Sequence, residues 1–265
     1  SIYSVYDVYP DVGIQLGIFK NHFVIKMVSF LERYCLNHAR IVRIISGSFM
    51  QGLLNLGVTE SKILLIHDWV DVDLIKPIPK INLFSENQNL SKNFVVLYAG
   101  NLGFSQGLEI IVQVARELST DPEILFLFVG DGSGRSHLIE EVNKNQLSNV
   151  RFIEFQPREL LPQVLASADV SLVVLKKSIG FSSIPSKILS ILASNRPILA
   201  SIDEGCEGWQ LIQNADAGIC VSPENAIALA EAIVKLKNDK SLREQFGNHG
   251  RDWVLQHHSP QVAAD

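Results

Sequence analysis

Two glycine-rich loops follow predicted strands. The apolar run FVVLYAG (94–100) leads into the loop NLGFSQG (101–107), and LFLFVGDGSG (125–134) repeats the pattern. The glycines of these loops are Gly100, Gly103, Gly107, Gly130, Gly132 and Gly134. Glycine lets the backbone approach a diphosphate closely, and a helix that begins after such a loop offers unpaired N–H groups. The pair of loops therefore predicts a nucleotide site, and the alternative is that the glycines only turn the chain.

A third loop, KKSIGFSSIPSK (176–187), ends in Lys187 at the start of a predicted helix. An ammonium group beside the hydroxyls of Ser183 and Ser186 can hold a phosphate or a sugar, whereas a solvated lysine is the alternative. No Ser-His-Asp or Cys-His arrangement is evident, and the histidines lack the spacing of zinc ligands. The DxD motif Asp71–Asp73 lies away from the glycine loops, so we expect no metal.

Composition limits the classes of function. The chain has 265 residues, is 47% hydrophobic and carries a net charge of −5, which argues against a nucleic-acid partner held by a broad basic face. Cys35, Cys206 and Cys220 are odd in number and widely spaced, which favours a reducing, cytoplasmic compartment. No signal peptide or membrane span is evident, and a strand-like segment is already under way at Ser1, so we expect a fragment.

Strands and helices alternate strictly after residue 93, which predicts a parallel sheet with ligands at the carboxyl ends of its strands. Before that point the pattern is less regular. We expect a helix over 16–34, a strand over 41–46, a helix over 48–57 capped by Ser48 and Gly57, a linker over 76–93, and two final helices over 224–239 and 241–258.

The order of motifs resembles a known family. YAGNLGFSQGLE, FVGDGSG, VRFIEF, ADVSLVVL and PSKILSILASNRPILAS follow one another as in the donor domain of retaining glycosyltransferases of family 4, nearest to the subgroup that builds capsular and colanic-acid-like surface polysaccharides. DVYPD, SGSFMQGLLNLGV and HDWVD resemble the second half of that family's acceptor domain. The resemblance implies an α/β chain of the GT-B type. Residues 1–75 would be part of the acceptor-side Rossmann-like domain and 76–265 the donor domain, with 241–265 a helix returning towards the first.

The resemblance also implies site residues. Asp7 and Lys187 would be catalytic. Asp7 would position the acceptor hydroxyl, and the alternative is that it is only a carboxylate at a turn. Asp11 has no counterpart among the family's site residues. The expected donor-binding residues are Gly100, Asn101, Gly103, Gln106, Gly130, Gly132, Gln156, Ser182, Ser183, Ser186 and Ser190. The backbone of 155–157 would contact the nucleobase.

The chain departs from the family at two pairs of positions. Ser182 and Ser190 stand where the family has two glutamates, and Asn101 and Gln106 replace its basic pair. Lys187 is the best replacement cation. Arg135, Lys176 and Lys177 are further candidates.

By resemblance, the leaving phosphate acts as the base in a retaining, metal-independent transfer. The sugar would pass from a nucleoside-diphosphate-sugar to a glycan or lipid-linked acceptor. A non-catalytic nucleotide-sugar-binding or interaction subunit is the alternative, and the piece alone is expected to be inactive. Residues 12–59 carry a local charge of +4, so residues 16–43 could contact an anionic membrane at the inner face of the plasma membrane. A core helix with a solvated basic edge is the other interpretation.

Overall fold

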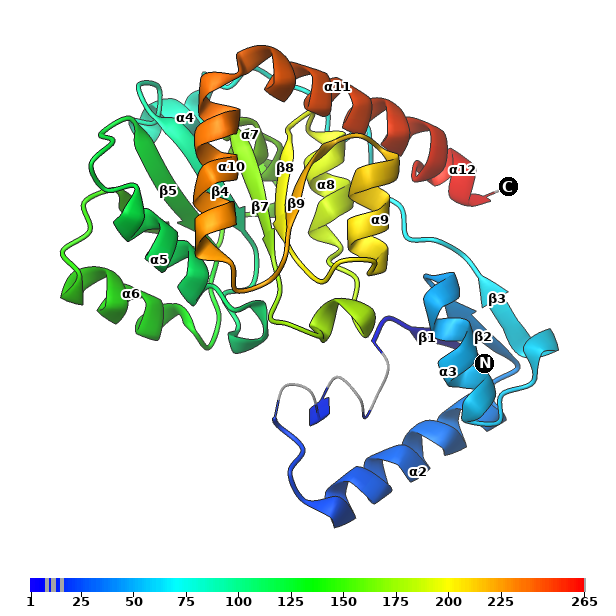
Figure 1. The fold of residues 1–265 in the computed structure, drawn as a ribbon. Coiled ribbons are helices and arrows are strands. Elements are labelled where there is room, and N and C mark those ends of the chain that lie inside the picture. The colour runs from blue at the N-terminus through cyan, green and yellow to red at the C-terminus, as the bar shows by residue number, and fades with distance from the viewer. Residues whose placement is uncertain (8–9, 11–12, 15–16, 265) are drawn as a thin grey trace.

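The chain forms two parallel β-sheets flanked by helices (Figure 1). The computed structural model describes residues 1–7, 10, 13–14 and 17–264. Part of the DVYPD motif, including Asp11, lies outside the described residues, as does Leu16, the expected start of the first helix. The α/β class expected from the alternating pattern is confirmed.

The larger sheet has six strands in the order β6-β5-β4-β7-β8-β9, all parallel. Its strands are β4 (Phe94–Ala99), β5 (Ile124–Val129), β6 (Val150–Ile153), β7 (Val170–Val174), β8 (Ile198–Ser201) and β9 (Gly218–Val221). Strands such as ILFLFV are apolar throughout because both faces of the sheet are covered. The strand order reverses between β4 and β7, the place where open α/β sheets bind ligands.

Helices cover both faces of this sheet (Figure 1). Alternate residues of the strands pack into two separate cores, one beneath α5, α6 and α10 and the other beneath α4, α7, α8 and α9. The helices of this part are α4 (Leu83–Asn87), α5 (Glu109–Glu117), α6 (Arg135–Lys144), α7 (Leu161–Ala166), α8 (Lys187–Ala193), α9 (Glu207–Asn214), α10 (Ala226–Asn238), α11 (Lys240–His257) and α12 (Pro260–Ala264).

The smaller sheet has the order β1-β2-β3, again parallel, and a small core of its own. Its strands are β1 (Ile2–Val5), β2 (Ile41–Ile44) and β3 (Ile63–Leu65), and its helices are α2 (His22–His38) and α3 (Met50–Asn55). The expected helix over 16–34 was misplaced, because Asn21 caps α2 by accepting the N–H of Phe23 at 2.8 Å.

The helix expected over 48–57 is confirmed by α3, but its expected cap at Ser48 was wrong, and so was the expectation of a linker without secondary structure over 76–93. The helix expected over 48–57 is capped by Ser46, which accepts the N–H of Ser48, and it opens with a 3₁₀ turn before α3. Gly57 follows α3 with φ +88°, a conformation that glycine adopts without strain. The expected linker contains α4, because Asn82 and Ser85 form a reciprocal capping box.

His258, which follows α11, lies against residues 68–70. The His258 ring bonds the Asp68 carbonyl at 2.8 Å, and the Val70 N–H donates to the His258 carbonyl at 3.0 Å. α12, which follows α11, was not expected. The domain limits at 75 and 241 stay a prediction. Within the described part of the chain, no helix combines the length and apolarity needed to cross a membrane.

Candidate donor-binding site

A cavity of about 670 Å³ lies at the carboxyl ends of β4 and β7, where the two sheets meet. Strand residues of the larger sheet line it, together with Tyr6 and Trp69 from the segments that follow β1 and β3 of the smaller one. The predicted site residues that line the cavity are Asp7, Gly100, Asn101, Gln106, Gln156, Ser183, Ser186, Lys187 and Ser190. The structure therefore brings together residues of the first and third loops, of the segment after β6 and of the N-terminal segment.

The predicted residues Gly103, Gly130, Gly132 and Ser182 do not line the cavity among the described residues. A Cβ at Gly130 would lie 2.0 Å from the carbonyl oxygen of Gly100, and one at Gly132 would lie 2.5 Å from Asn101 Oδ1. These glycines let the second loop pack against the first, a role that differs from both phosphate binding and simple chain turning. Ser182 is buried, and its N–H donates to the Ile179 carbonyl at 3.0 Å.

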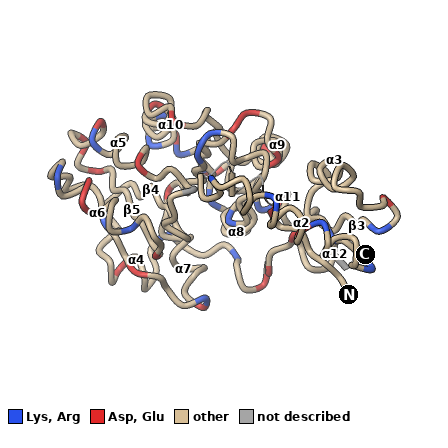
Figure 2. The backbone as a smooth tube through the Cα atoms, turned by 90° about the horizontal axis from the view of Figure 1, so that it is seen from below, with Lys and Arg blue, Asp and Glu red and all other residues tan. Residues whose placement is uncertain are grey.

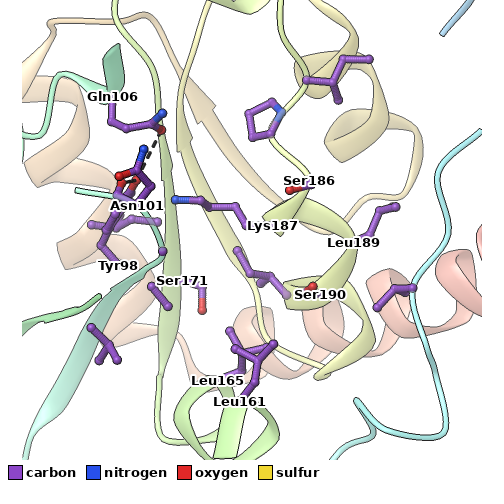
Figure 3. Close-up of a pocket in the computed structure, with 18 of the residues that line it drawn as sticks. Tyr98, Asn101, Gln106, Leu161, Leu165, Ser171, Ser186, Lys187, Leu189 and Ser190 are labelled. Carbon is purple, nitrogen blue, oxygen red and sulfur yellow. Dashed lines mark hydrogen bonds between the residues drawn. The ribbon is translucent and has the colours of Figure 1, made fainter. Parts of the chain in front are cut away.

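Lys187 points its ammonium group into the cavity, towards Tyr98 and Asn101 (Figure 3). Its Nζ is buried, lies 3.6 Å from the centroid of the Tyr98 ring, and has no hydrogen-bond partner among the residues described. Burial lowers the pKa of Lys187 from 10.5 to about 7. A buried cation without an anionic partner is costly, so the geometry suits an anion that enters from outside.

Gly100 leaves room for this lysine. A Cβ at Gly100 would lie 3.2 Å from Lys187 Nζ, and the residue has φ +135°. The other candidate cations, Arg135, Lys176 and Lys177, are not among the described residues that line the cavity. Lys187 is therefore the cation that the cavity offers to a phosphate.

Tyr98 contacts both the first loop, through its hydroxyl, and Lys187, through its ring. It was not predicted from the sequence as a site residue. Its hydroxyl donates to the Asn101 carbonyl at 2.9 Å and lies 3.3 Å from Gln106 Oε1, while its ring faces the ammonium group. Burial raises the pKa of this phenol well above its usual range. A tyrosine at the end of an otherwise apolar buried strand was the available signal, because its hydroxyl needs a partner.

Asp203 shapes the third loop and was also missed. This buried carboxylate accepts the N–H of Ser178 at 2.9 Å and that of Gly180 at 3.1 Å. Ser183, three residues beyond, forms an antiparallel backbone bridge with Asp7. The loop that carries Lys187 is thus fixed from two sides, by the end of β8 and by the N-terminal segment.

Arg43 organises the opposite wall. Its guanidinium pairs with Asp68 at 2.8 Å, donates to the Tyr6 hydroxyl at 3.0 Å, and lies 5.5 Å from the Trp69 ring. Arg43 is buried, so the expectation that it belongs to a basic membrane-facing surface was wrong.

A contact between the two parts of the chain involves Glu207 on α9. Glu207 accepts a hydrogen bond from Ser48 at 3.1 Å, and burial raises the pKa of Glu207.

The floor of the cavity runs along the sheet between α7 and α8 and is mostly apolar, with Leu161, Leu165 and Leu189 around it (Figure 3). Ser171 on β7 is an exception. Its hydroxyl is buried and has no hydrogen-bond partner within the described structure. Such a surface accommodates a flat or apolar part of a ligand and offers one hydrogen bond to it.

Comparison with known proteins assigns the chain that forms this cavity to a family. The family model described as "Glycosyl transferases group 1" matches residues 80–253, which include the larger sheet and all three loops. The chain belongs to the glycosyl transferases group 1 family. The similarity to curated proteins covers more of the chain than this match. A protein of Escherichia coli K12 named as a colanic acid biosynthesis glycosyl transferase, WcaI, is 28% identical over 233 residues, covering 86% of this chain and 57% of that protein.

Two other proteins are similar to this chain. A Pseudomonas aeruginosa protein named as a glycosyltransferase, WbjE, is 26% identical over 232 residues and is covered to 58%. The crystal structure of Anabaena HepE in complex with UDP-glucose superposes with a TM-score of 0.82 at 17% identity, over 99% of this chain and 69% of that one. The GT-B fold class is confirmed. The chain spans a little over half the length of the two curated relatives.

Proposed function

We propose that this chain is the donor-binding part of a retaining, metal-independent glycosyltransferase of surface-polysaccharide biosynthesis. The donor is a nucleoside-diphosphate-sugar and the acceptor is a growing, lipid-linked glycan at the cytoplasmic face of the plasma membrane. The observation that carries the proposal is the buried, unpartnered Nζ of Lys187 in a cavity shared by the two sheets. Membership of the group 1 family and likeness to a colanic acid biosynthesis relative support the class of reaction.

The proposed reaction gives Lys187 and Asp7, which line the cavity, different roles. The bond between the anomeric carbon and the phosphate oxygen breaks, and the nucleoside diphosphate leaves with the electron pair. The acceptor oxygen bonds to the anomeric carbon on the same face, and its proton passes to the leaving phosphate oxygen. Lys187 stabilises the negative charge that develops on that phosphate, a role in which a preorganised cation in a low-dielectric site is effective. Asp7, which lies in the cavity wall and forms the bridge to Ser183, orients the acceptor in this proposal.

Two observations support the remaining parts of the proposal. Among the described residues that line the cavity, the carboxylates are Asp7 and Asp68, and Asp68 is already paired with Arg43. The described residues contain no cluster of three His, Cys, Asp or Glu side chains suited to a metal ion. We therefore include neither a covalent glycosyl-enzyme intermediate nor a metal in the proposal.

A second candidate is a nucleotide-sugar-binding subunit without catalysis. The presence of Ser182 and Ser190 where the family has glutamates favours it, since a hydroxyl bonds a ribose or sugar less strongly than a carboxylate does. Both candidates require that the cavity bind a nucleoside diphosphate. They differ in whether a sugar reaches an acceptor.

Calorimetric titration with UDP, GDP, ADP and their sugar conjugates tests the shared requirement. Selective binding of one nucleoside diphosphate, weakened by Lys187→Met, supports the proposed donor site. Absence of binding to every nucleotide would refute both candidates. Product analysis with the bound conjugate and a lipid-linked glycan then separates them, because only the enzyme forms a new glycoside, and its anomeric configuration tests retention.

A further inference from the structure

The floor of the cavity contains a buried hydroxyl without a partner. Ser171 on β7 is 2% exposed and lines the cavity, and its Oγ has no hydrogen-bond partner within the described structure. Most buried hydroxyls in proteins are hydrogen-bonded. A serine hydroxyl rotates between staggered positions, so it can turn towards a molecule that enters the cavity. The unpaired hydroxyl therefore suits a polar atom that a ligand supplies.

Ser171 lies further down the strands than Lys187 does. It is opposite Leu97 in the register of β4 and β7, and Gly100, which lies beside the ammonium group of Lys187, comes three residues after Leu97. At about 3.3 Å per residue of a strand, the two levels are roughly 10 Å apart. This separation is comparable to the length of a nucleoside. A diphosphate at Lys187 and a base at Ser171 can therefore belong to one ligand.

The lining between these two levels suits a base better than a sugar. Leu165 on α7 and Leu189 on α8 flank the floor (Figure 3). A sugar carries several hydroxyl groups, and an apolar wall would leave them without partners at a cost in free energy. A nucleobase is flat, so its faces can lie against leucine side chains while its edge reaches a polar group. In the proposed reaction the sugar faces the acceptor beside Asp7, so the nucleoside extends the other way, along the larger sheet.

The polar side chains near Ser171 are few. The central strands β5, β4, β7 and β8 carry no charged residue, and the charges of this part of the chain lie on the elements around them (Figure 2). On β7 and α8 the described lining contains one further hydroxyl, that of Ser190, while Gln156 after β6 donates to a nearby backbone carbonyl at 3.0 Å. The carboxylates of the lining, Asp7 and Asp68, belong to the segments that follow β1 and β3. A base on the floor therefore meets hydroxyl groups rather than a carboxylate.

The N–H groups of a base decide how well it fits such a floor. Guanine presents a ring N–H and an amino group, adenine and cytosine present an amino group, and uracil and thymine present a single ring N–H. A buried N–H without an acceptor is rarer in proteins than an under-satisfied carbonyl, and it is costly. One hydroxyl can accept the N–H of uracil or thymine and donate to the carbonyl beside it. These two bases leave no N–H unpaired against the apolar lining.

We propose that the floor of the cavity is a base subsite in which the Ser171 hydroxyl accepts the ring N–H of uracil or thymine. The donor is then a uridine or thymidine diphosphate sugar. The inference rests on the proposed function, because it concerns the base of the same donor, and it adds the class of base and the residue that selects it. Selection follows because a purine or cytosine leaves an amino N–H without an acceptor in a dry site.

Replacement of Ser171 by alanine tests the contact. In calorimetric titration, Ser171→Ala should weaken the binding of UDP by about fivefold, the effect of losing one neutral hydrogen bond. Inorganic pyrophosphate has no base, so its affinity should be the same in Ser171→Ala and in the parent. The parent should bind UDP and TDP about tenfold more tightly than ADP, CDP and GDP, because each of the latter leaves a buried donor unpaired.

Ser201→Ala is the matched control. Ser201 on β8 is also buried and has an unpartnered hydroxyl, but it is not among the described residues that line the cavity. Its replacement should leave the affinity for UDP unchanged. Neither substitution should lower the midpoint of thermal unfolding, because neither removes a hydrogen bond of the described structure. Loss of UDP affinity with an unchanged midpoint separates a ligand contact from a structural role.

The inference is overturned if Ser171→Ala binds UDP like the parent, if Ser201→Ala loses as much affinity, or if the parent shows no preference for UDP and TDP. The proposed function has separate outcomes. If GDP binds most tightly and Lys187→Met weakens it, the donor site stands and the base subsite is refuted. If UDP binds with the expected preference but no new glycoside forms, the base subsite stands and the proposed transfer is refuted. Absence of binding to every nucleotide and to pyrophosphate refutes both.

Discussion

Replacing Lys187 by methionine should remove both the affinity of the cavity for a diphosphate and the dependence of that affinity on pH. Methionine keeps the length and apolar stem of the side chain while deleting its charge, so packing against Tyr98 and Gly100 is largely preserved. A hydrogen bond to a charged group contributes about 1.5–3 kcal/mol, which corresponds to a loss of at least about tenfold in affinity at neutral pH.

The pH dependence follows from the pKa of Lys187, which burial lowers to about 7 in the unliganded protein. A bound diphosphate favours the charged amine and returns this pKa towards its ordinary value of 10.5. At about pH 9 roughly one unliganded molecule in a hundred carries the charge, compared with about half at pH 7. Affinity should therefore fall about 50-fold between these two conditions, in the direction of rising pH.

The free energy of unfolding should change in the opposite sense. The unfolded chain holds the Lys187 proton up to a higher pH than the native one, so the parent gains stability relative to Lys187→Met as pH rises above about 7, by up to about 1.4 kcal/mol per pH unit. Calorimetric titration with UDP-glucose suits the binding measurement because its diphosphate does not titrate in this range. Lys144→Met, on the exposed side of α6, is the control. A parent affinity that is flat with pH, or that falls equally in Lys187→Met, would refute the reasoning.

Three other substitutions probe the surroundings of the cavity. In thermal unfolding, Gly130→Ala should destabilise the fold by more than roughly 2 kcal/mol, because its Cβ would lie 2.0 Å from the Gly100 carbonyl oxygen. The control is Gly52→Ala, which should be neutral or stabilising because its Cβ has no atom within 4 Å. Tyr98→Phe should lower the free energy of unfolding by about 1 kcal/mol through loss of its hydroxyl bonds but keep the ring under the ammonium group, so the pH profile of nucleotide binding should be unchanged; a flattened profile would contradict this. Asp68→Asn should cost about 2 kcal/mol in denaturant unfolding because it leaves the guanidinium of Arg43 buried without its carboxylate, and a cost near zero would show that the pair is not stabilising.

The fold of the larger sheet could be predicted because its information is local. Apolar runs such as FVVLYA and ILFLFV, each followed by glycine, define strands and loops without reference to distant residues. Lys187 could be singled out as a cavity residue for the same reason, since it ends a loop between two recognisable elements. The short helix α4 was missed because its composition is polar and its one signal is the capping box at Asn82.

The parts of the site that depend on long-range approach could not be predicted. Asp203 acts on backbone amides of a loop that precedes it by more than twenty residues, and nothing near it in the sequence indicates that contact. Arg43 looked like a surface cation because its partners Tyr6 and Asp68 come from other segments. The apolar periodicity of α2 predicted a helix correctly but left open which face would be buried.

The backbone bridge between Asp7 and Ser183 has a consequence for how the cavity opens. The loop that it holds leads into Lys187, whose Nζ is buried, so a separation of the N-terminal segment from this loop would move the residues next to Lys187 and could expose the ammonium group to water. Once hydrated, that amine takes up a proton from neutral solution. If the cleft opens, proton uptake by Lys187 accompanies the opening, and the absorbance change of a pH indicator in weakly buffered solution would measure it.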